Sequence, residues 1–163
     1  MSANVARDLK PVDALEVQVL VDNVTDSLST VPKDVTNEVG VLRRNGNLKM
    51  AAGEYRCCAH HGLSLIITAR AGKDKRTLIF DAGPEAYTVT RNGALLKVPF
   101  ADAGALVLSH GHWDHAGGLV EAVRQVVTAN GGSQGECHVN PGMFVTRGSL
   151  RHGDEVLLQK PVP

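Results

Sequence analysis

The sequence predicts an α+β domain, a mixed sheet with flanking helices. Short apolar runs of strand length recur along the chain, and stretches with helical spacing or helix-ending residues separate some of them. The composition is that of an ordinary globular protein, with 43% hydrophobic and 21% charged residues. At 163 residues the chain fits one domain, 1–163, that is long enough to bury a core.

Three strands are expected in the first half. Residues 15–21 (LEVQVLV) alternate apolar and polar side chains, which is typical of a strand. Residues 62–69 (GLSLIITA) form a β-branched run, and the connection 71–75 leads from it into a strand at 77–81. The segment 24–56 is polar and rich in turn formers, so we expect a long loop that is either functional or disordered.

The middle of the chain predicts a helix followed by a strand. Pro84 can open a helix that runs to Val98, although Asn92-Gly93 is expected to interrupt it. Residues 105–109 (ALVLS) are short and almost wholly apolar, which favours a strand buried on both faces.

The last third predicts one helix and two short strands. Residues 118–129 place apolar side chains at helical spacing, and Asn130-Gly131-Gly132 ends the helix. A strand is expected at 136–140, and the tail 155–163 holds one strand-like run.

Charge and cysteine content exclude several classes of protein. Lysine plus arginine and aspartate plus glutamate number 17 each, which argues against a nucleic-acid partner. The sequence shows neither an apolar run of the roughly 20 residues that span a bilayer nor a secretory signal at its N-terminus. The three cysteines, Cys57, Cys58 and Cys137, do not form a disulfide framework, so we expect a cytoplasmic protein without a membrane partner.

Residues 108–119 (LSHGHWDHAGGL), hereafter the histidine motif, carry the strongest functional signal. The motif follows the predicted strand 105–109 and is too short to be a helix of its own. Imidazole and carboxylate together suit zinc, iron or manganese. His110 and His112 are two residues apart, so on an extended segment they point the same way and can hold one ion. Asp114 and His115 follow a turn and can face a second ion.

The stretch SHGHWDHAGG resembles the H-x-H-x-D-H signature of the metallo-β-lactamase superfamily. The resemblance implies an αββα sandwich, with His110 and His112 on the first metal and Asp114 and His115 on the second. It also implies that Asp81, in LIFDAG (78–83), orients the motif without touching the metal; the alternative is an ordinary turn aspartate.

More narrowly, VDN (21–23) and HGLSLII (61–67), taken with the histidine motif, are similar to the branch of dihydropterin ribofuranosylaminobenzene phosphate synthase-like proteins. The similarity covers about residues 15–145. The other histidines are expected to have lesser roles. His60 and His61 are interpreted as surface residues or as partners of the ligands, and His138 and His152 as structural residues.

The family pattern implies a second half with three further ligands: a histidine for the first metal, a bridging aspartate and a last histidine for the second. After Glu121 the only acidic residues and histidines are Glu136, His138, His152, Asp154 and Glu155, and none has the family spacing. We therefore expect the N-terminal half of the domain, incomplete at its C-terminus, with one sheet face uncovered and little activity alone. Its expected partner is a second copy, as a homo-oligomer, or a missing C-terminal half.

The function expected from this resemblance is that of a metal-dependent hydrolase acting on a small molecule. One or two Zn²⁺ ions, or Fe or Mn, would lower the pKa of a bound water, and the hydroxide would attack an ester, phosphoester or amide. Asp114 is the candidate catalytic residue, because it can orient that water or accept its proton. The alternatives are a synthase-like condensation on a phosphorylated pterin precursor, and an inactive fragment or binding module that retains the motif.

Overall fold

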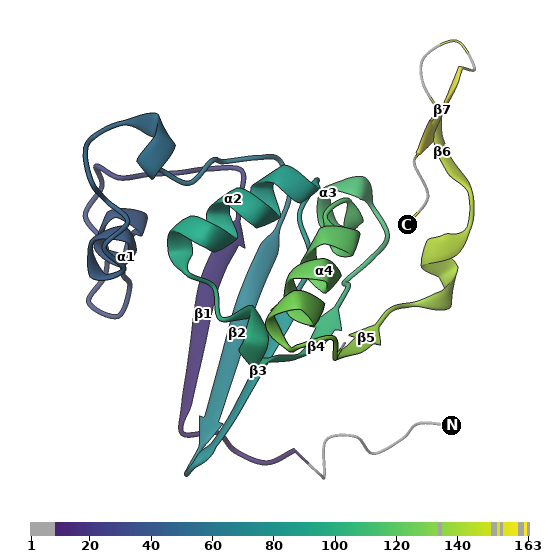
Figure 1. The fold of residues 1–163 in the computed structure, drawn as a ribbon. Helices are drawn as coiled ribbons and strands as arrows, with labels where there is room; N and C mark the ends of the chain where they lie inside the picture. The colour runs from purple at the N-terminus through teal and green to yellow at the C-terminus, as the bar shows by residue number, and fades with distance from the viewer. Residues whose placement is uncertain (1–8, 134, 151–152, 154, 160–161, 163) are drawn as a thin grey trace.

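A five-stranded sheet forms the centre of the computed structural model, which describes residues 9–133, 135–150, 153, 155–159 and 162 (Figure 1). The strand order is β1-β2-β3-β4-β5. The strands are β1 (Ala14–Val21), β2 (Ser64–Ala71), β3 (Asp74–Phe80), β4 (Ala103–Val107) and β5 (Glu136–His138). Strands β1 to β3 are antiparallel neighbours, whereas β3, β4 and β5 run parallel. The predicted mixed sheet is therefore confirmed.

Two helices, α2 (Ala86–Leu96) and α4 (Leu119–Ala129), lie side by side on one face of this sheet (Figure 1). Beneath them, Ile66, Ile79 and Leu106 are neighbours in register on β2, β3 and β4, and all three are buried. Val89 of α2 and Val126 of α4 belong to the same core. The apolar side chains on this face of the strands thus pack against the apolar stripe of each helix and form one apolar layer.

No described helix covers the opposite face, hereafter the open face. Its apolar side chains are Leu15, Val17, Val19, Leu65, Ile67, Leu78, Phe80, Ala105 and Val107. On the edge strand β1, Leu15, Val17 and Val19 are 62%, 51% and 48% exposed. An uncovered sheet face was expected from the sequence, and the described part of the chain has one.

Strand β4 corrects one expectation. We predicted burial on both faces of the run. Leu106 and Leu108 are buried, but Ala105 and Val107 on the open face are partly exposed. An apolar run with no polar alternation is typical of a strand covered on both sides. Here the described helices cover one side, so the second side of the run stays accessible.

Helix α2 also differs from its prediction, because Asn92-Gly93 does not interrupt it. The side-chain amide of Asn92 is buried and donates to the carbonyls of Leu20 and Cys58. Gly93 faces the ring of Phe100, which an added Cβ would approach to 2.9 Å. Both residues have a low helix propensity, but their tertiary contacts stabilise them inside the helix.

The segment 24–56 is not loop throughout. It contains α1 (Glu38–Arg44), and Asn37 caps this helix by accepting a hydrogen bond from the Gly40 amide at 3.0 Å. Leu42 anchors α1 in the core. The cap residue was the available signal, but a helix of seven residues is too short to show clear periodicity. The described residues also form three short 3₁₀ helices: η2 (Gly53–Tyr55), η3 (Phe100–Asp102) and η4 (Pro141–Phe144).

The C-terminal segment forms a separate two-stranded sheet of β6 (Arg147–Leu150) and β7 (Val156–Gln159). It lies away from the main sheet (Figure 1). The predicted tail strand is confirmed as β7, whereas β6 was not predicted, and the strand expected at 136–140 ends at His138. Within the described residues, no helix has the length and apolar character needed to cross a membrane.

Candidate metal centre

The histidine motif lies where the parallel strands β3 and β4 both end. Strand β4 delivers Ser109 and His110 to this edge, and β3 delivers Asp81. The motif then forms a single helical turn of four residues, α3 (Trp113–Ala116), and continues into α4. The carboxyl ends of neighbouring parallel strands are where polar side chains from separate segments can converge.

His110 and His112 face each other across 3.0 Å, measured from Nε2 of the first ring to Nδ1 of the second. Two nitrogens bound to one tetrahedral zinc ion, each about 2.0–2.1 Å from it, are about 3.3 Å apart. The pair therefore has the spacing of two ligands of one ion.

Asp114 and His115 form a second pair beside the first. His115 Nε2 lies 3.5 Å from an Asp114 carboxylate oxygen, and the rings of His115 and His110 have centroids 4.3 Å apart. Among the described residues, no three His, Cys, Asp or Glu side chains form a ready site for one ion. The motif thus presents two adjacent pairs of donors.

Asp81 is fully buried behind these histidines and is not an exposed turn residue. Its carboxylate accepts hydrogen bonds from the Ser109 amide, the Ser109 hydroxyl and His115 Nδ1, each at 2.8 Å. Because a carboxylate only accepts, His115 carries its proton on Nδ1 and its lone pair on Nε2. Asp81 also adopts a left-handed backbone conformation, with φ of 58°.

The same network extends to His110. The Ser109 hydroxyl donates to Asp81, so it accepts from His110 Nδ1, which lies 2.9 Å away. This assignment leaves the lone pair of His110 on Nε2, the atom that faces His112. Burial lowers the pKa of His110, and the neighbouring His115 and His112 lower it further. A lowered pKa favours the neutral form of the ring, which a metal ligand requires.

Residues 61–63 are joined to the histidine motif by backbone contacts. The Leu63 amide donates to the Asp114 carbonyl at 3.2 Å, and a Cβ on Gly62 would lie 2.2 Å from that oxygen. Only glycine permits this approach, with φ of 147°. The contact places His61 beside the motif, with Nε2 at 3.7 Å from an Asp114 carboxylate oxygen. His61 is therefore a direct neighbour of the Asp114 carboxylate.

Arg147 on β6 is a contact of the motif that sequence reasoning missed. Its guanidinium donates to the Gly111 carbonyl at 2.8 Å and to the Met143 carbonyl at 3.1 Å. Gly111 separates the two facing histidines, so Arg147 ties the C-terminal segment to the backbone between them. No local pattern identifies such a residue, because the contact spans 36 positions of sequence.

His60 and His138 pair with carboxylates outside the histidine motif. His60 Nε2 is 3.4 Å from a Glu85 oxygen, and His138 Nε2 is 3.1 Å from a Glu136 oxygen. His138 is exposed on β5. His152 lies outside the described residues.

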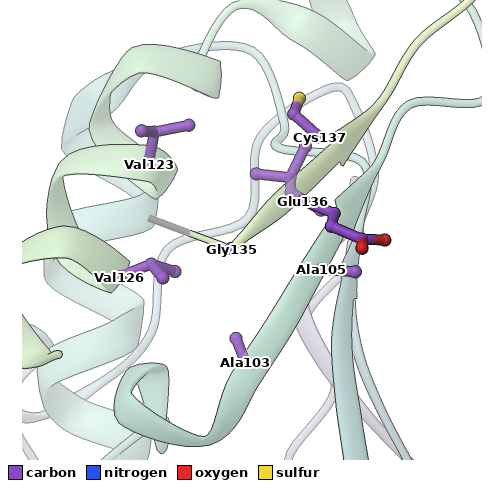
Figure 2. Close-up of a pocket in the computed structure, with 8 residues that line it drawn as sticks. Ala103, Ala105, Val123, Val126, Gly135, Glu136 and Cys137 are labelled. Atoms are coloured by element: carbon purple, nitrogen blue, oxygen red, sulfur yellow. The ribbon is translucent and has the colours of Figure 1, made fainter. Parts of the chain in front are cut away.

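Two hollows lie elsewhere on the described part of the chain, and each is lined in part by cysteine. Figure 2 shows a cavity of about 220 Å³ between α4 and the β4–β5 edge, lined mainly by small apolar side chains and by Cys137. Burial raises the pKa of the Cys137 thiol. A groove of about 780 Å³ beside β1 is lined partly by Cys57 and Cys58, and burial raises the pKa of Cys57 to about 12. Burial raises the pKa of Cys58 as well, so the thiolate form of these cysteines is disfavoured at neutral pH.

Comparison with known proteins identifies the family of the chain. The model of the metallo-beta-lactamase superfamily matches residues 60–153, more than half of the chain, so the protein belongs to that superfamily. The histidine motif and Asp81 both lie inside the matched stretch.

A more particular similarity is to the 7,8-dihydropterin-6-methyl-4-(beta-D-ribofuranosyl)-aminobenzene-5'-phosphate synthase of Methanocaldococcus jannaschii, with 31% identity over 68 residues. The aligned stretch covers 42% of this chain and 23% of that protein. The chain thus matches less than a quarter of the length of this relative.

Proposed function

We propose that the histidine motif holds one or two divalent transition-metal ions and supports hydrolysis of an ester, phosphoester or amide in a small molecule. His110 and His112 would hold the first ion, and Asp114 and His115 the second. Zn²⁺ is the first candidate because of the imidazole-rich donor set, with Fe and Mn as alternatives. The observation that carries the proposal is the 3.0 Å approach of His110 Nε2 to His112 Nδ1.

The residues around this pair have separable tasks. When bound, such a cation supplies Lewis acidity and a water of lowered pKa. Asp81 holds His115 with Nε2 free, and through Ser109 it holds His110 likewise. Asp114, which has one carboxylate oxygen near both His115 and His61, would orient a water or accept its proton.

A synthase-like condensation on a phosphorylated pterin precursor is the second candidate. It is supported by the similarity to the archaeal pterin phosphate synthase. The superfamily fold does not choose between the two reactions, since one fold supports different chemistries. We place both candidate reactions at the same donor pairs, so metal binding is tested first.

Elemental analysis of protein purified without chelator tests metal binding. We expect at least half an equivalent, roughly, of zinc, iron or manganese, or its uptake on soaking. His110→Ala and His112→Ala should each lose it, because each removes one of two facing nitrogens. His138→Ala, which removes an exposed histidine from β5, is the matched control and should keep the metal.

Two outcomes would contradict the proposal. Wild-type protein with less than about a tenth of an equivalent, and no uptake on soaking, would indicate an inactive module that retains the motif. Equal metal content in His112→Ala and His138→Ala would place the ion elsewhere.

A further inference from the structure

The single tryptophan of the chain, Trp113, lies at the centre of the histidine motif and is 46% exposed. Its ring contacts that of His61, with centroids 5.7 Å apart and planes inclined by 34°. A tryptophan gains most from burial, so one that keeps nearly half of its surface exposed contributes little to the core. The position of this exposed ring beside Asp114 therefore suggests a contact with a ligand.

Backbone contacts hold together the two segments that carry these rings. Gly62 and Leu63 are held against the Asp114 carbonyl, which places His61 over the motif. Trp113 begins α3, and the Gly117 amide donates to its carbonyl at 2.8 Å. Both rings thus belong to segments that are joined at Asp114.

We propose that Trp113 and His61 form a platform on which a planar aromatic ring of the substrate stacks. The inference rests on the proposed function, because it places the ring next to the donor pairs. His61 Nε2 is 3.7 Å from an oxygen of Asp114, so a ring on this platform lies beside the candidate reaction centre. The ligand class is a planar heterocycle or arene that carries the bond to be cleaved or formed.

The physical basis is stacking in a partly desolvated position. An aromatic side chain that stacks on a planar ring contributes about 1–3 kcal/mol per ring, which corresponds to roughly a 5-fold to 150-fold change in affinity. Stacking selects for a flat π surface, whereas a general apolar contact would accept a saturated ring equally well.

The lone indole also provides the assay. In a ¹⁵N-labelled chain the Trp113 side chain gives one indole N–H resonance, which is followed by NMR during titration with 6-carboxypterin. Cyclohexanecarboxylate serves as a carboxylate without an aromatic ring. Ligand affinity is measured in parallel by calorimetry for wild type, W113F, W113L and Y87L, and the metal content of each sample is determined.

We expect 6-carboxypterin to shift the indole resonance and cyclohexanecarboxylate to leave it in place. W113L should weaken pterin binding by about 5-fold or more, and W113F by about threefold or less, since phenylalanine retains a stacking ring. Y87L is the control, because it removes another exposed ring, 58% exposed on α2, with the same substitution.

Several results would overturn the platform. These are an indole resonance that 6-carboxypterin does not move, equal binding by W113L and wild type, or equal binding of the saturated carboxylate. Loss of metal from W113F and W113L would make Trp113 a structural part of the motif. A metal-free wild type whose pterin binding still depends on Trp113 would refute the proposed function and leave the platform standing.

Discussion

Three hydrogen bonds converge on the carboxylate of Asp81, and two of them decide which nitrogens of the histidine motif are free. One holds His115 directly, and the other holds His110 through the Ser109 hydroxyl. At the scale of the residue, the donor geometry therefore depends on a side chain that lies outside the motif.

Asp81→Asn should weaken metal binding by about 10-fold to 100-fold, the usual effect of removing an outer partner of a ligand. Asparagine tolerates the left-handed backbone of position 81, so the change acts on the hydrogen bonds and not on the chain conformation. Affinity is measured by Zn²⁺ competition with a chromophoric chelator. Asp22→Asn, the same change at an exposed carboxylate, is the control, and equal affinity of both variants would contradict the argument.

The sequence revealed the residues of the motif but not all of their neighbours. The spacing of His110 and His112 predicted that the two rings point the same way, because that follows from local geometry. The resemblance suggested Asp81 as a partner of the motif. Arg147 could not be predicted, since its bond to Gly111 depends on how a distant segment folds back. His61 was recognised only as a surface or partner residue, because no pattern specifies the approach of Gly62 to Asp114.

At the scale of the element, strands and long helices were predictable, whereas short or locally unfavourable ones were not. The apolar run 15–21 and the amphipathic 118–129 correspond to β1 and α4 almost residue for residue. Helix α2 was expected to break because asparagine and glycine disfavour helices, yet buried contacts of Asn92 and the Phe100 ring against Gly93 outweigh this preference.

Glu121 joins the two helices that cover the sheet. It accepts from Thr90 of α2 at 2.7 Å and from Arg124 and Gln125 of its own helix. The hydrogen bond from Arg124 is the largest of the effects that lower the pKa of Glu121, to about 2. Because the folded-state pKa is depressed, the stabilisation is present above the ordinary value of 4.5 and is lost as the pH falls toward 2.

Glu121→Gln should therefore reduce the free energy of unfolding by about 1 kcal/mol at pH 7, and by less at pH values below the ordinary carboxyl pKa. Urea denaturation at several pH values measures the difference. Glu136→Gln, on the exposed strand β5, should have little effect at any pH. A destabilisation by Glu121→Gln that does not change with pH would mean that packing, and not the carboxylate charge, links the helices.

At the scale of the whole molecule, the open face is the main consequence of the fold. One apolar surface of the sheet meets α2 and α4, and the other carries apolar side chains of β1, β2, β3 and β4 that remain at least partly accessible. A sheet with apolar side chains on both faces needs a cover on each side, and contiguous apolar patches that stay uncovered favour association.

The 163-residue chain should therefore self-associate in solution through the open face. A second copy fits this role because two identical sheet faces can pack against each other, and a net charge of zero leaves no overall repulsion between copies.

Replacing Val17 and Val19 together by lysine places two charges on the most accessible strand of the face and should shift the protein toward the monomer. Leu28→Lys, at an exposed apolar residue outside the sheet, is the control and should not. Light scattering over a range of protein concentrations measures the mass of each variant. A wild-type protein that stays monomeric at the highest concentration, or a lysine pair that leaves the oligomer intact, would show that the open face does not join two copies.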